Sequence, residues 1–271
     1  MWCNGGNDMG RLDGRVAIVT GGGQGIGRGI ARRFAREGAA VVVAEINPDT
    51  GAAVVAEITE ELGGRAIFVP TDVLQQDQVE AMVQQTVDEL GTVHILVNNA
   101  YVAGGFARFE HKPDGDLELA FRGGPLHTWW AMRAAFPHMK AQQWGRIINF
   151  VSLNGINAHK YSADYNAAKE AIRAITRTAA VEWGRHNILC NCIAPAAASP
   201  AYVAFATAAP ENAKEMLQAN PLRRMGDPEH DIGGVALFLA SEDSDYVTGN
   251  TIFASGGTQV NGVQWDPPMP D

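Results

Sequence analysis

Three side chains in the middle of the chain have the types and spacing to exchange a proton with an alcohol or a ketone. Ser152 follows an apolar run, and Tyr165 and Lys169 stand four residues apart in a helical pattern. Residues four apart share one face of a helix, so the Lys169 ammonium is expected to lower the pKa of the Tyr165 phenol from its usual value of about 10. Ser152 can donate a hydrogen bond to a substrate oxygen as charge develops on it. The pattern predicts a catalytic trio with Tyr165 as the acid/base.

A glycine-rich loop near the start of the chain has the features of a nucleotide-binding loop. Residues Thr20–Gly27 read TGGGQGIG, with an apolar run before them and a helical pattern after them. A pyrophosphate can rest on a helix N-terminus only if the backbone approaches closely, so glycines are needed where a Cβ would collide. A plain tight turn is the alternative. The residues predicted to bind the cofactor here are Gly21, Gln24, Gly25, Ile26 and Gly27.

Glu45 ends the second apolar run, about 20 residues past the loop, where an acidic side chain can accept hydrogen bonds from both ribose hydroxyls of an adenosine. A 2′-phosphate would be repelled there, and Gln24 offers it no positive charge. The sequence therefore predicts NAD(H) rather than NADP(H) as the cofactor. A solvated glutamate at a strand end is the alternative.

The elements that must position these residues are short apolar runs alternating with helical patterns, which is typical of βαβ units around a parallel sheet buried on both faces. The predicted strands are Val16–Thr20, Val41–Glu45, Ala66–Pro70, Val93–Val97, Ile147–Val151, Ile188–Ile193 and Thr251–Ala254. The predicted helices are Ile26–Glu37, Thr50–Leu62, Gln76–Leu90, Tyr165–Trp183 and Asp231–Leu239. The predicted fold class is α/β, a single doubly wound, Rossmann-like domain over residues 1–271 with a seven-stranded parallel sheet and helices on both faces. Residues 1–11 and 263–271 are expected to be peripheral tails.

The composition excludes several classes of partner. Of the 271 residues, 46% are hydrophobic and 19% are charged, and the formal net charge is -9. Docking on nucleic acid or on anionic lipid needs clustered Lys and Arg, so neither nucleic acid nor a membrane is expected as a partner. Without a run of about 18 apolar residues or a secretory leader, the chain is expected in the cytoplasm. Three cysteines indicate no disulfide framework and no metal site, and Cys190 and Cys192 are expected to be buried thiols.

These motifs, in this order, resemble those of the short-chain dehydrogenase/reductase family from about Leu12 to Val260. Thr20–Gly27 is similar to its TGxxxGxG loop, and Ser152 with Tyr165 and Lys169 is similar to its Ser and YxxxK. The resemblance implies an NAD-dependent alcohol dehydrogenase or ketoreductase in which Lys169 also binds the nicotinamide ribose. It extends the cofactor site to Asp72, Val73, Asn98, Ala100, Tyr165, Lys169, Pro195 and Ala198. It also implies a homodimer or homotetramer, packed through the helices containing Trp129–Phe136 and Tyr165–Glu182.

The chain departs from the family pattern at the nicotinamide end of the site. Gly124 stands where the family usually has an Asn on its central helix, and Tyr101 replaces the glycine of its NNAG motif. Gly123-Gly124-Pro125 predicts that the helix breaks or begins at this point. One hypothesis is that His127, one turn past Gly124, takes over part of the proton relay, and the alternative is a histidine at the surface or the edge of the core.

The expected substrate is a hydrophobic secondary alcohol or ketone, alicyclic or aromatic. Tyr101 and the segment Pro200–Ala219, which the resemblance implies is a mobile lid, suggest an apolar pocket without a cationic clamp for a carboxylate or phosphate. His159 is expected either to reach the substrate or to be solvated. Further aromatic residues expected to frame the pocket, or to lie in the core or a subunit contact, are Phe106, Phe109, Phe121, Trp129, Trp130, Tyr202 and Phe205.

Two other functions remain open from the sequence. A non-redox enzyme on the same scaffold, such as a lyase or a dehalogenase, is compatible with Gly124 but disfavoured by the intact nucleotide loop and by Lys169. A catalytically silent NAD-binding subunit would bind NADH without turning over any carbonyl compound.

Overall fold

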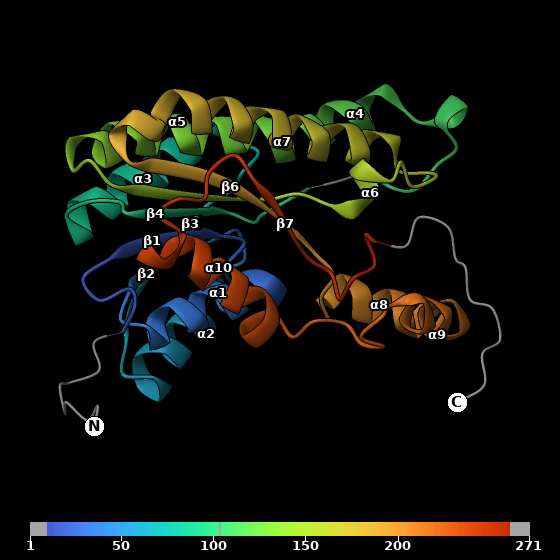
Figure 1. Cartoon of the computed structure of the whole chain (residues 1–271), viewed down its shortest axis with the longest axis horizontal. Coiled ribbons are helices and arrows are strands. Elements are labelled where there is room, and N and C mark those ends of the chain that lie inside the picture. Colours follow the sequence, from blue (N-terminus) through green and yellow to red (C-terminus); the bar gives the residue numbers. More distant parts are fainter. Residues whose placement is uncertain (1–9, 103, 261–271) are drawn as a thin grey trace.

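The computed structural model describes residues 10–102 and 104–260, which build one parallel sheet with helices on both of its faces (Figure 1). The strand order is β3-β2-β1-β4-β5-β6-β7. The chain thus leaves β1 in one direction and returns to its other side at β4, as expected for a doubly wound sheet. The strands are β1 Val16–Thr20, β2 Ala40–Glu45, β3 Arg65–Pro70, β4 Ile95–Asn98, β5 Gly145–Phe150, β6 Ile188–Pro195 and β7 Thr251–Ala254. The predicted fold class and all seven strands are confirmed, with ends that differ by one or two residues.

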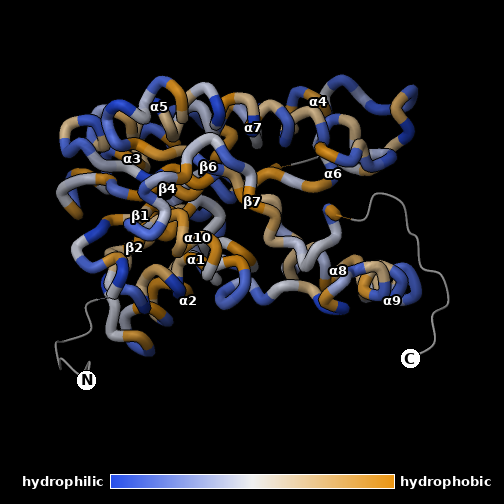
Figure 2. The backbone as a smooth tube through the Cα atoms, in the orientation of Figure 1, coloured by the Kyte–Doolittle hydropathy of each residue, from blue (hydrophilic) through white to orange (hydrophobic). Residues whose placement is uncertain are grey.

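Two hydrophobic clusters cover the two faces of the sheet. One packs α1 (Gly25–Arg36), α2 (Pro48–Ala56) and α10 (Gly233–Ala240) on the strands. The other packs α3 (Gln76–Leu90), α5 (His127–Ala141) and α7 (Ala163–Trp183) on the opposite face. Figure 2 shows hydrophobic residues concentrated along the central strands and hydrophilic stretches on the outlying helices. Because both faces are covered, the strands are apolar throughout rather than alternating.

Four further helices escaped the sequence patterns and lie near the carboxyl edge of the sheet. They are α4 (Asp114–Phe121), the single-turn α6 (Leu153–Ile156) and the pair α8 (Pro200–Ala208) and α9 (Pro210–Ala219). The α8–α9 pair corresponds to the segment expected to be a lid, and it projects to one side of the sheet (Figure 1).

The helix break expected at Gly123-Gly124-Pro125 is wrong. The chain stays helical from α4 into α5 through a π-helix, Arg122–Leu126, in which Pro125 is buried. A π-helix bonds each N–H to the carbonyl five residues back, so the proline is accommodated by a change of hydrogen-bond pattern instead of an interruption. The Gly123 carbonyl accepts hydrogen bonds from the Val102 N–H and from Nδ1 of His127.

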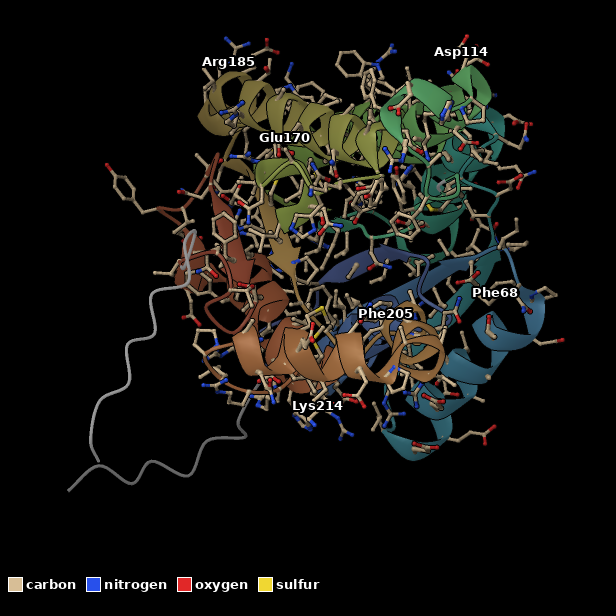
Figure 3. All side chains as sticks on the ribbon, turned by 90° about the vertical axis from the view of Figure 1, so that its right-hand side faces the viewer. Phe68, Asp114, Glu170, Arg185, Phe205 and Lys214 are labelled. Carbon is tan, nitrogen blue, oxygen red and sulfur yellow. The ribbon has the colours of Figure 1, made fainter. Side chains whose placement is uncertain are left out.

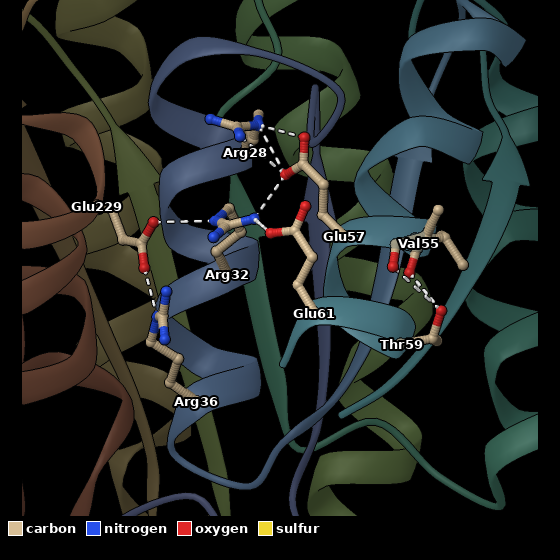
Figure 4. Close-up of polar contacts among 9 residues, drawn as sticks. Arg28, Arg32, Arg36, Val55, Glu57, Thr59, Glu61 and Glu229 are labelled. Carbon is tan, nitrogen blue, oxygen red and sulfur yellow. Dashed lines mark hydrogen bonds and ion pairs between the residues drawn. The ribbon is translucent and has the colours of Figure 1, made fainter. Parts of the chain in front are cut away.

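An ion-pair cluster ties α1 to the two π-helices on its flanks, Glu57–Glu61 and Pro228–Ile232 (Figure 4). Arg32 lies in the middle, 2.8 Å from Glu57 and 3.0 Å from Glu229. Arg28 pairs with Glu57 and Arg36 with Glu229. Burial lowers the pKa of the Arg32 guanidinium, but the hydrogen bonds to its carboxylates outweigh burial, so that this pKa is raised overall.

Cys190 and Cys192 are buried in β6, which confirms that expectation. Among the described residues no helix has both the length and the apolar content needed to cross a bilayer. The expected tails fall almost entirely on residues 1–9 and 261–271, which lie outside the described residues.

Candidate active site

A cavity of about 460 Å³ opens at the carboxyl edge of the sheet, where strands β1 and β4 separate the two halves of the fold. This is the position at which doubly wound sheets bind their ligands. Figure 3 looks onto this edge, with α7 labelled at Glu170 above the strand ends and the α8–α9 pair labelled at Phe205 and Lys214 below them. The predicted cofactor residues that line the cavity are Gly21, Gln24, Gly25, Ile26, Glu45, Asp72, Val73, Ala100, Tyr165, Lys169 and Pro195.

The glycine loop has the backbone geometry that a phosphate cradle needs. Gly21 and Gly25 have positive φ angles of 63° and 53°, which L side chains rarely adopt. A Cβ at Gly27 would lie 2.0 Å from the Gly21 carbonyl oxygen, so only glycine permits this close return of the chain. The loop leads directly into the N-terminus of α1, whose backbone N–H groups favour an anion. The residues present therefore fit a nucleotide pyrophosphate.

Glu45 lies at the end of β2 and is 8% exposed. Its carboxylate accepts hydrogen bonds from the backbone N–H groups of Gly23 at 3.1 Å, Ile46 at 2.9 Å and Asn47 at 3.2 Å. The glutamate therefore shapes the loop as well as lining the cavity, a role that the sequence did not reveal.

Lys169 projects from α7 into a buried position. Its Nζ donates to the Phe150 carbonyl oxygen at 2.9 Å, at the end of β5. Burial lowers the pKa of Lys169 to about 7, since an ammonium is costly to hold away from water. Near neutral pH this side chain is therefore poised between its charged and neutral forms.

Tyr165 stands one turn before Lys169 on α7, with Nζ of Lys169 5.6 Å from the centre of its ring. Burial raises the pKa of the phenol, which differs from the expected lowering by Lys169. The Ser152 hydroxyl lies close enough to offset part of this increase. Ser152 also caps α6 by accepting a hydrogen bond from the Asn154 N–H at 3.1 Å, so its side chain is held beside Tyr165.

Three predicted cofactor residues lie outside the cavity. Gly27 is buried beneath the loop, where it permits the close return to Gly21. Asn98 is buried in the sheet and donates from Nδ2 to Asn149 Oδ1 at 2.8 Å, because its side chain points to the α5 face. Ala198 lines a neighbouring cavity, behind α8, together with Arg28 and His230.

Polar residues that the sequence did not single out also organise the site. The Thr20 hydroxyl accepts from the N–H groups of Asn99 and Ala100, and Asn99 Nδ2 donates to the Thr20 and Gly21 carbonyls, so β1 and β4 are tied together at the cavity floor. Thr20 begins the TGxxxGxG loop and Asn99 is the second asparagine of the NNAG motif. Their positions in these two motifs could have identified them from the sequence. Ser199 lines the cavity and caps α8 by accepting from the Tyr202 N–H.

The structure shows where His127, His159 and Tyr101 lie relative to the cavity. His127 is buried, not at the surface; its Nδ1 donates to the Gly123 carbonyl oxygen at 3.0 Å, and among the described residues Nε2 has no partner. Burial and the nearby Lys169 lower the pKa of His127 to about 3, so the ring is neutral. His159 is exposed to solvent. Tyr101 lines the cavity beside Tyr165, with the two ring centres 5.0 Å apart.

The part of the cavity next to Tyr165 is largely apolar, with Tyr101, Val102 and Val151 in its wall. Among the described residues that line the cavity, Lys169 is the one cationic side chain. Of the other aromatic residues expected to frame the pocket, Phe106 and Phe109 are instead more than four-fifths exposed, and Trp129 lies on the outer face of α5.

A glycine loop, Tyr165 and Lys169 line one cavity, and Ser152 stands beside Tyr165, an arrangement that suits nicotinamide-dependent oxidoreduction. In sequence, the family described as enoyl-(acyl carrier protein) reductase matches residues 21–259. The chain belongs to this family, within the short-chain dehydrogenases/reductases, and is an alcohol dehydrogenase or ketoreductase of that type.

Relatives cover nearly the whole chain. The 12α-hydroxysteroid dehydrogenase of Clostridium sp. is 35% identical over 255 residues, which are 92% of this chain and 98% of that protein. A solved 7α-hydroxysteroid dehydrogenase, complexed with NADH and 7-oxo glycochenodeoxycholic acid, is 36% identical with a TM-score of 0.86 and covers 93% of this chain and 97% of its own. A solved NAD+-bound xylitol dehydrogenase is 30% identical with a TM-score of 0.85, covering 91% of this chain and 99% of its own.

Proposed function

We propose that this chain interconverts a hydrophobic, alicyclic or aromatic secondary alcohol and its ketone with NAD(H) as the cofactor. The observation that carries the proposal is that Tyr165 and Lys169 line the cavity that the glycine loop opens, with Ser152 beside Tyr165. Bound NAD(H) would accept or supply the hydride. Tyr165 exchanges the proton at the substrate oxygen, Ser152 donates a hydrogen bond to that oxygen, and the Lys169 ammonium stabilises the phenolate.

NAD rather than NADP is supported by the buried carboxylate of Glu45 at the end of β2. A 2′-phosphate beside it would meet a negative charge in a partly desolvated place. Two related structures contain NADH or NAD+, which agrees with this choice.

The hydrophobic substrate class is supported by the apolar wall of Tyr101, Val102 and Val151 and by the bulky steroid ligand of one relative. A polyol is the competing class, because another relative is a xylitol dehydrogenase. The test follows nicotinamide absorbance with NAD or NADP and a panel of steroidal, cyclic, aromatic and polyol alcohols. Reduction of NAD by steroidal, cyclic or aromatic alcohols supports the proposal. Turnover of polyols alone contradicts the proposed substrate class, and equal efficiency with NADP contradicts the proposed cofactor preference.

Tyr165→Phe tests the acid/base assignment. The variant should lose turnover by at least about 100-fold, because general acid–base catalysis contributes factors of this order, while it should bind NADH almost as the parent does. Tyr246→Phe is the matched control, since Tyr246 is fully exposed and far along the chain from the site. A Tyr165→Phe enzyme with parental kcat would show that another group transfers the proton.

We also propose that the protein acts in the cytoplasm and as a homodimer or homotetramer. The first statement is supported only in that a net charge of -9 disfavours docking on anionic lipid. The second is supported by exposed apolar side chains on the outer faces of α5 and α7, among them Trp129 and Val181.

A further inference from the structure

The ring of Tyr101 fills the space where a side chain at position 124 would lie. A Cβ built on Gly124 would be 2.8 Å from Cε2 of Tyr101, closer than real contacts allow, and 3.3 Å from Cδ2, which is tighter than most real contacts. The same Cβ would be 3.7 Å from Cβ of Ala168, the residue before Lys169 on α7. The two departures from the family pattern, at positions 101 and 124, are therefore the two halves of one contact.

The face of this ring is turned to the Lys169 ammonium. Nζ of Lys169 lies 4.3 Å from the centre of the Tyr101 ring, closer than to the Tyr165 ring at 5.6 Å. The one hydrogen-bond acceptor that the described residues offer to Nζ is the Phe150 carbonyl oxygen. An ammonium that is cut off from water gains most from the negative face of an aromatic ring.

We propose that Tyr101 is a positioning residue whose aromatic face holds Lys169 in its charged form beside Tyr165, and that the glycine at position 124 leaves the room this ring requires. The functional meaning rests on the proposed function, because only a dehydrogenase that uses Tyr165 needs this charge. The ring itself, not its hydroxyl, is the active part, since the hydroxyl is buried without a partner among the described residues.

Other titratable groups around Lys169 come from every neighbouring element. Tyr165 lies on its own helix, His127 on α5 and Cys192 on β6. Burial raises the pKa of the Cys192 thiol to about 11 and lowers the pKa of His127 to about 3, so both are neutral over the range in which Lys169 titrates. Burial, with Tyr165 and Asp164 nearby, raises the pKa of Tyr101, which stays a neutral phenol. Changes in the Lys169 titration can therefore be attributed to the ring.

The first experiment titrates Lys169 directly. The chain has five lysines, so labelling them with ¹³C at Cε gives a simple NMR spectrum in which Lys169 is assigned with Lys169→Arg. Tyr101→Phe keeps the aromatic face and should titrate as the parent, whereas Tyr101→Leu fills similar space without it and should titrate about one pH unit lower. Equal titration of Lys169 in the parent and in folded Tyr101→Leu would overturn the proposal.

The second experiment tests the contact with position 124. Gly124→Ala should displace the Tyr101 ring from Lys169 and lower the pH at which Lys169 titrates, as Tyr101→Leu does. In a Tyr101→Leu background, Gly124→Ala should lower this pH by almost nothing more. Gly115→Ala is the control on the same helical run, because nothing lies within 4 Å of a Cβ there. If the two substitutions shift the Lys169 titration additively, or if Gly124→Ala causes no shift, positions 101 and 124 act independently and the proposal is contradicted.

Neither titration depends on turnover, so the two proposals fail independently. Loss of the NMR effect with a normal alcohol dehydrogenase activity removes the role of Tyr101 alone. A preserved NMR effect in a chain that turns over no alcohol removes the proposed function alone. In an active enzyme, the pH profile of kcat/KM should shift in Tyr101→Leu and not in Tyr101→Phe.

Discussion

At the scale of single residues, Glu45 carries two tasks with one carboxylate. In the proposed function it binds the adenosine ribose, and in the structure it accepts hydrogen bonds from the N–H groups of Gly23, Ile46 and Asn47. Hydrogen bonds to a charged acceptor stabilise by about 1.5 to 3 kcal/mol each, so the loop depends on this side chain. Selection of the cofactor and the shape of the phosphate cradle are therefore coupled at this residue.

Glu45→Gln is expected to narrow the preference for NADH over NADPH, because it removes the charge that repels a 2′-phosphate and keeps one carbonyl oxygen as an acceptor. Glu45→Ala should in addition lower the melting temperature, because it leaves the backbone donors of the loop without their acceptor. Ratios of kcat/KM for the two cofactors, together with thermal unfolding, check both statements. A Glu45→Gln enzyme with an unchanged ratio would show that selectivity lies elsewhere.

The sequence identified most residues of the cavity, because the glycine loop and the Tyr165–Lys169 spacing depend on local geometry. It misplaced Asn98, since the direction of a side chain at a strand end is decided by its neighbour Asn149 on the next strand. It also predicted a lowered pKa for Tyr165 from its charge partner, whereas burial dominates and raises this pKa. Both errors concern long-range packing, on which local spacing carries no information.

At the scale of elements, the cluster around Arg32 joins three helical segments that are far apart in the sequence. The Arg32 side chain is 10% exposed, and Glu57 and Glu229 are 22% and 18% exposed. The guanidinium therefore neutralises two partly buried carboxylates beneath the phosphate loop. Burial raises the pKa of each carboxyl group, but the arginine hydrogen bonds outweigh it, so both pKa values are lowered overall.

Arg32→Met should lower the free energy of unfolding by roughly 2 to 3 kcal/mol, because it removes the buried guanidinium that Glu57 and Glu229 share and leaves them only the more exposed Arg28 and Arg36. Arg11→Met is the matched control. It breaks the exposed pair with Asp243, in which both side chains are more than half exposed, and should cost less than about 1 kcal/mol. Urea unfolding of both variants measures the difference, and equal costs would show that burial of the cluster does not matter.

The helices and strands that the sequence predicted depend on local patterns, and those that it missed depend on distant contacts or lack a clear pattern. The strands were predictable because continuous Val- and Ile-rich runs mark a sheet buried on both faces. The helical passage through Gly123-Gly124-Pro125 was not, because it depends on the Val102 N–H and on the His127 side chain, both of which bond the Gly123 carbonyl. α4 and α8 were missed because they bury few residues and carry little apolar periodicity, whereas α9 is amphipathic but buries only Ala213.

At the scale of the whole molecule, two histidines, His94 and His127, have lowered pKa values and so link the stability of the fold to pH. Nδ1 of His94 accepts a hydrogen bond from the Val16 N–H at 3.0 Å, between the start of β1 and the entry to β4. Burial, with help from Arg15, lowers the pKa of His94 from 6.5 to about 4, and burial lowers that of His127 to about 3. A lowered folded-state pKa means that the unfolded chain binds more protons below pH 6.5. The stabilisation is complete above that value and is lost as the pH falls.

His94→Gln should make the free energy of unfolding less dependent on pH between about 6.5 and 4 than it is in the parent. His111→Gln, at an exposed histidine, should keep the parental dependence. Denaturant titrations across this range provide the measurement. A parental slope in His94→Gln would mean that His94 does not set the acid limit.

The proposed oligomer makes a separate prediction. Val181 on α7 is 86% exposed and stands near a shallow apolar hollow that contains Trp129 and Trp183. Val181→Asp should yield a smaller species by light scattering, because an interface between identical copies places the new charge close to its symmetry mate. Val203→Asp, on exposed α8, is the control and should leave the mass unchanged. A monomeric parent would remove the proposal.

The position of Pro200 at the start of α8 has a consequence for the binding of small molecules. Its Cδ lies 2.8 Å from where a Cβ on Gly25 would be, and Pro200 and Gly25 both line the main cavity and the second cavity behind α8. The proline is thus a partition between two compartments. A small molecule seated behind it, among Arg28, Val203 and His230, would fix α8 without occupying the nucleotide cradle. Because Gly25 of the nucleotide loop also lines this second cavity, such a compound would contact the loop from the side opposite the nucleotide.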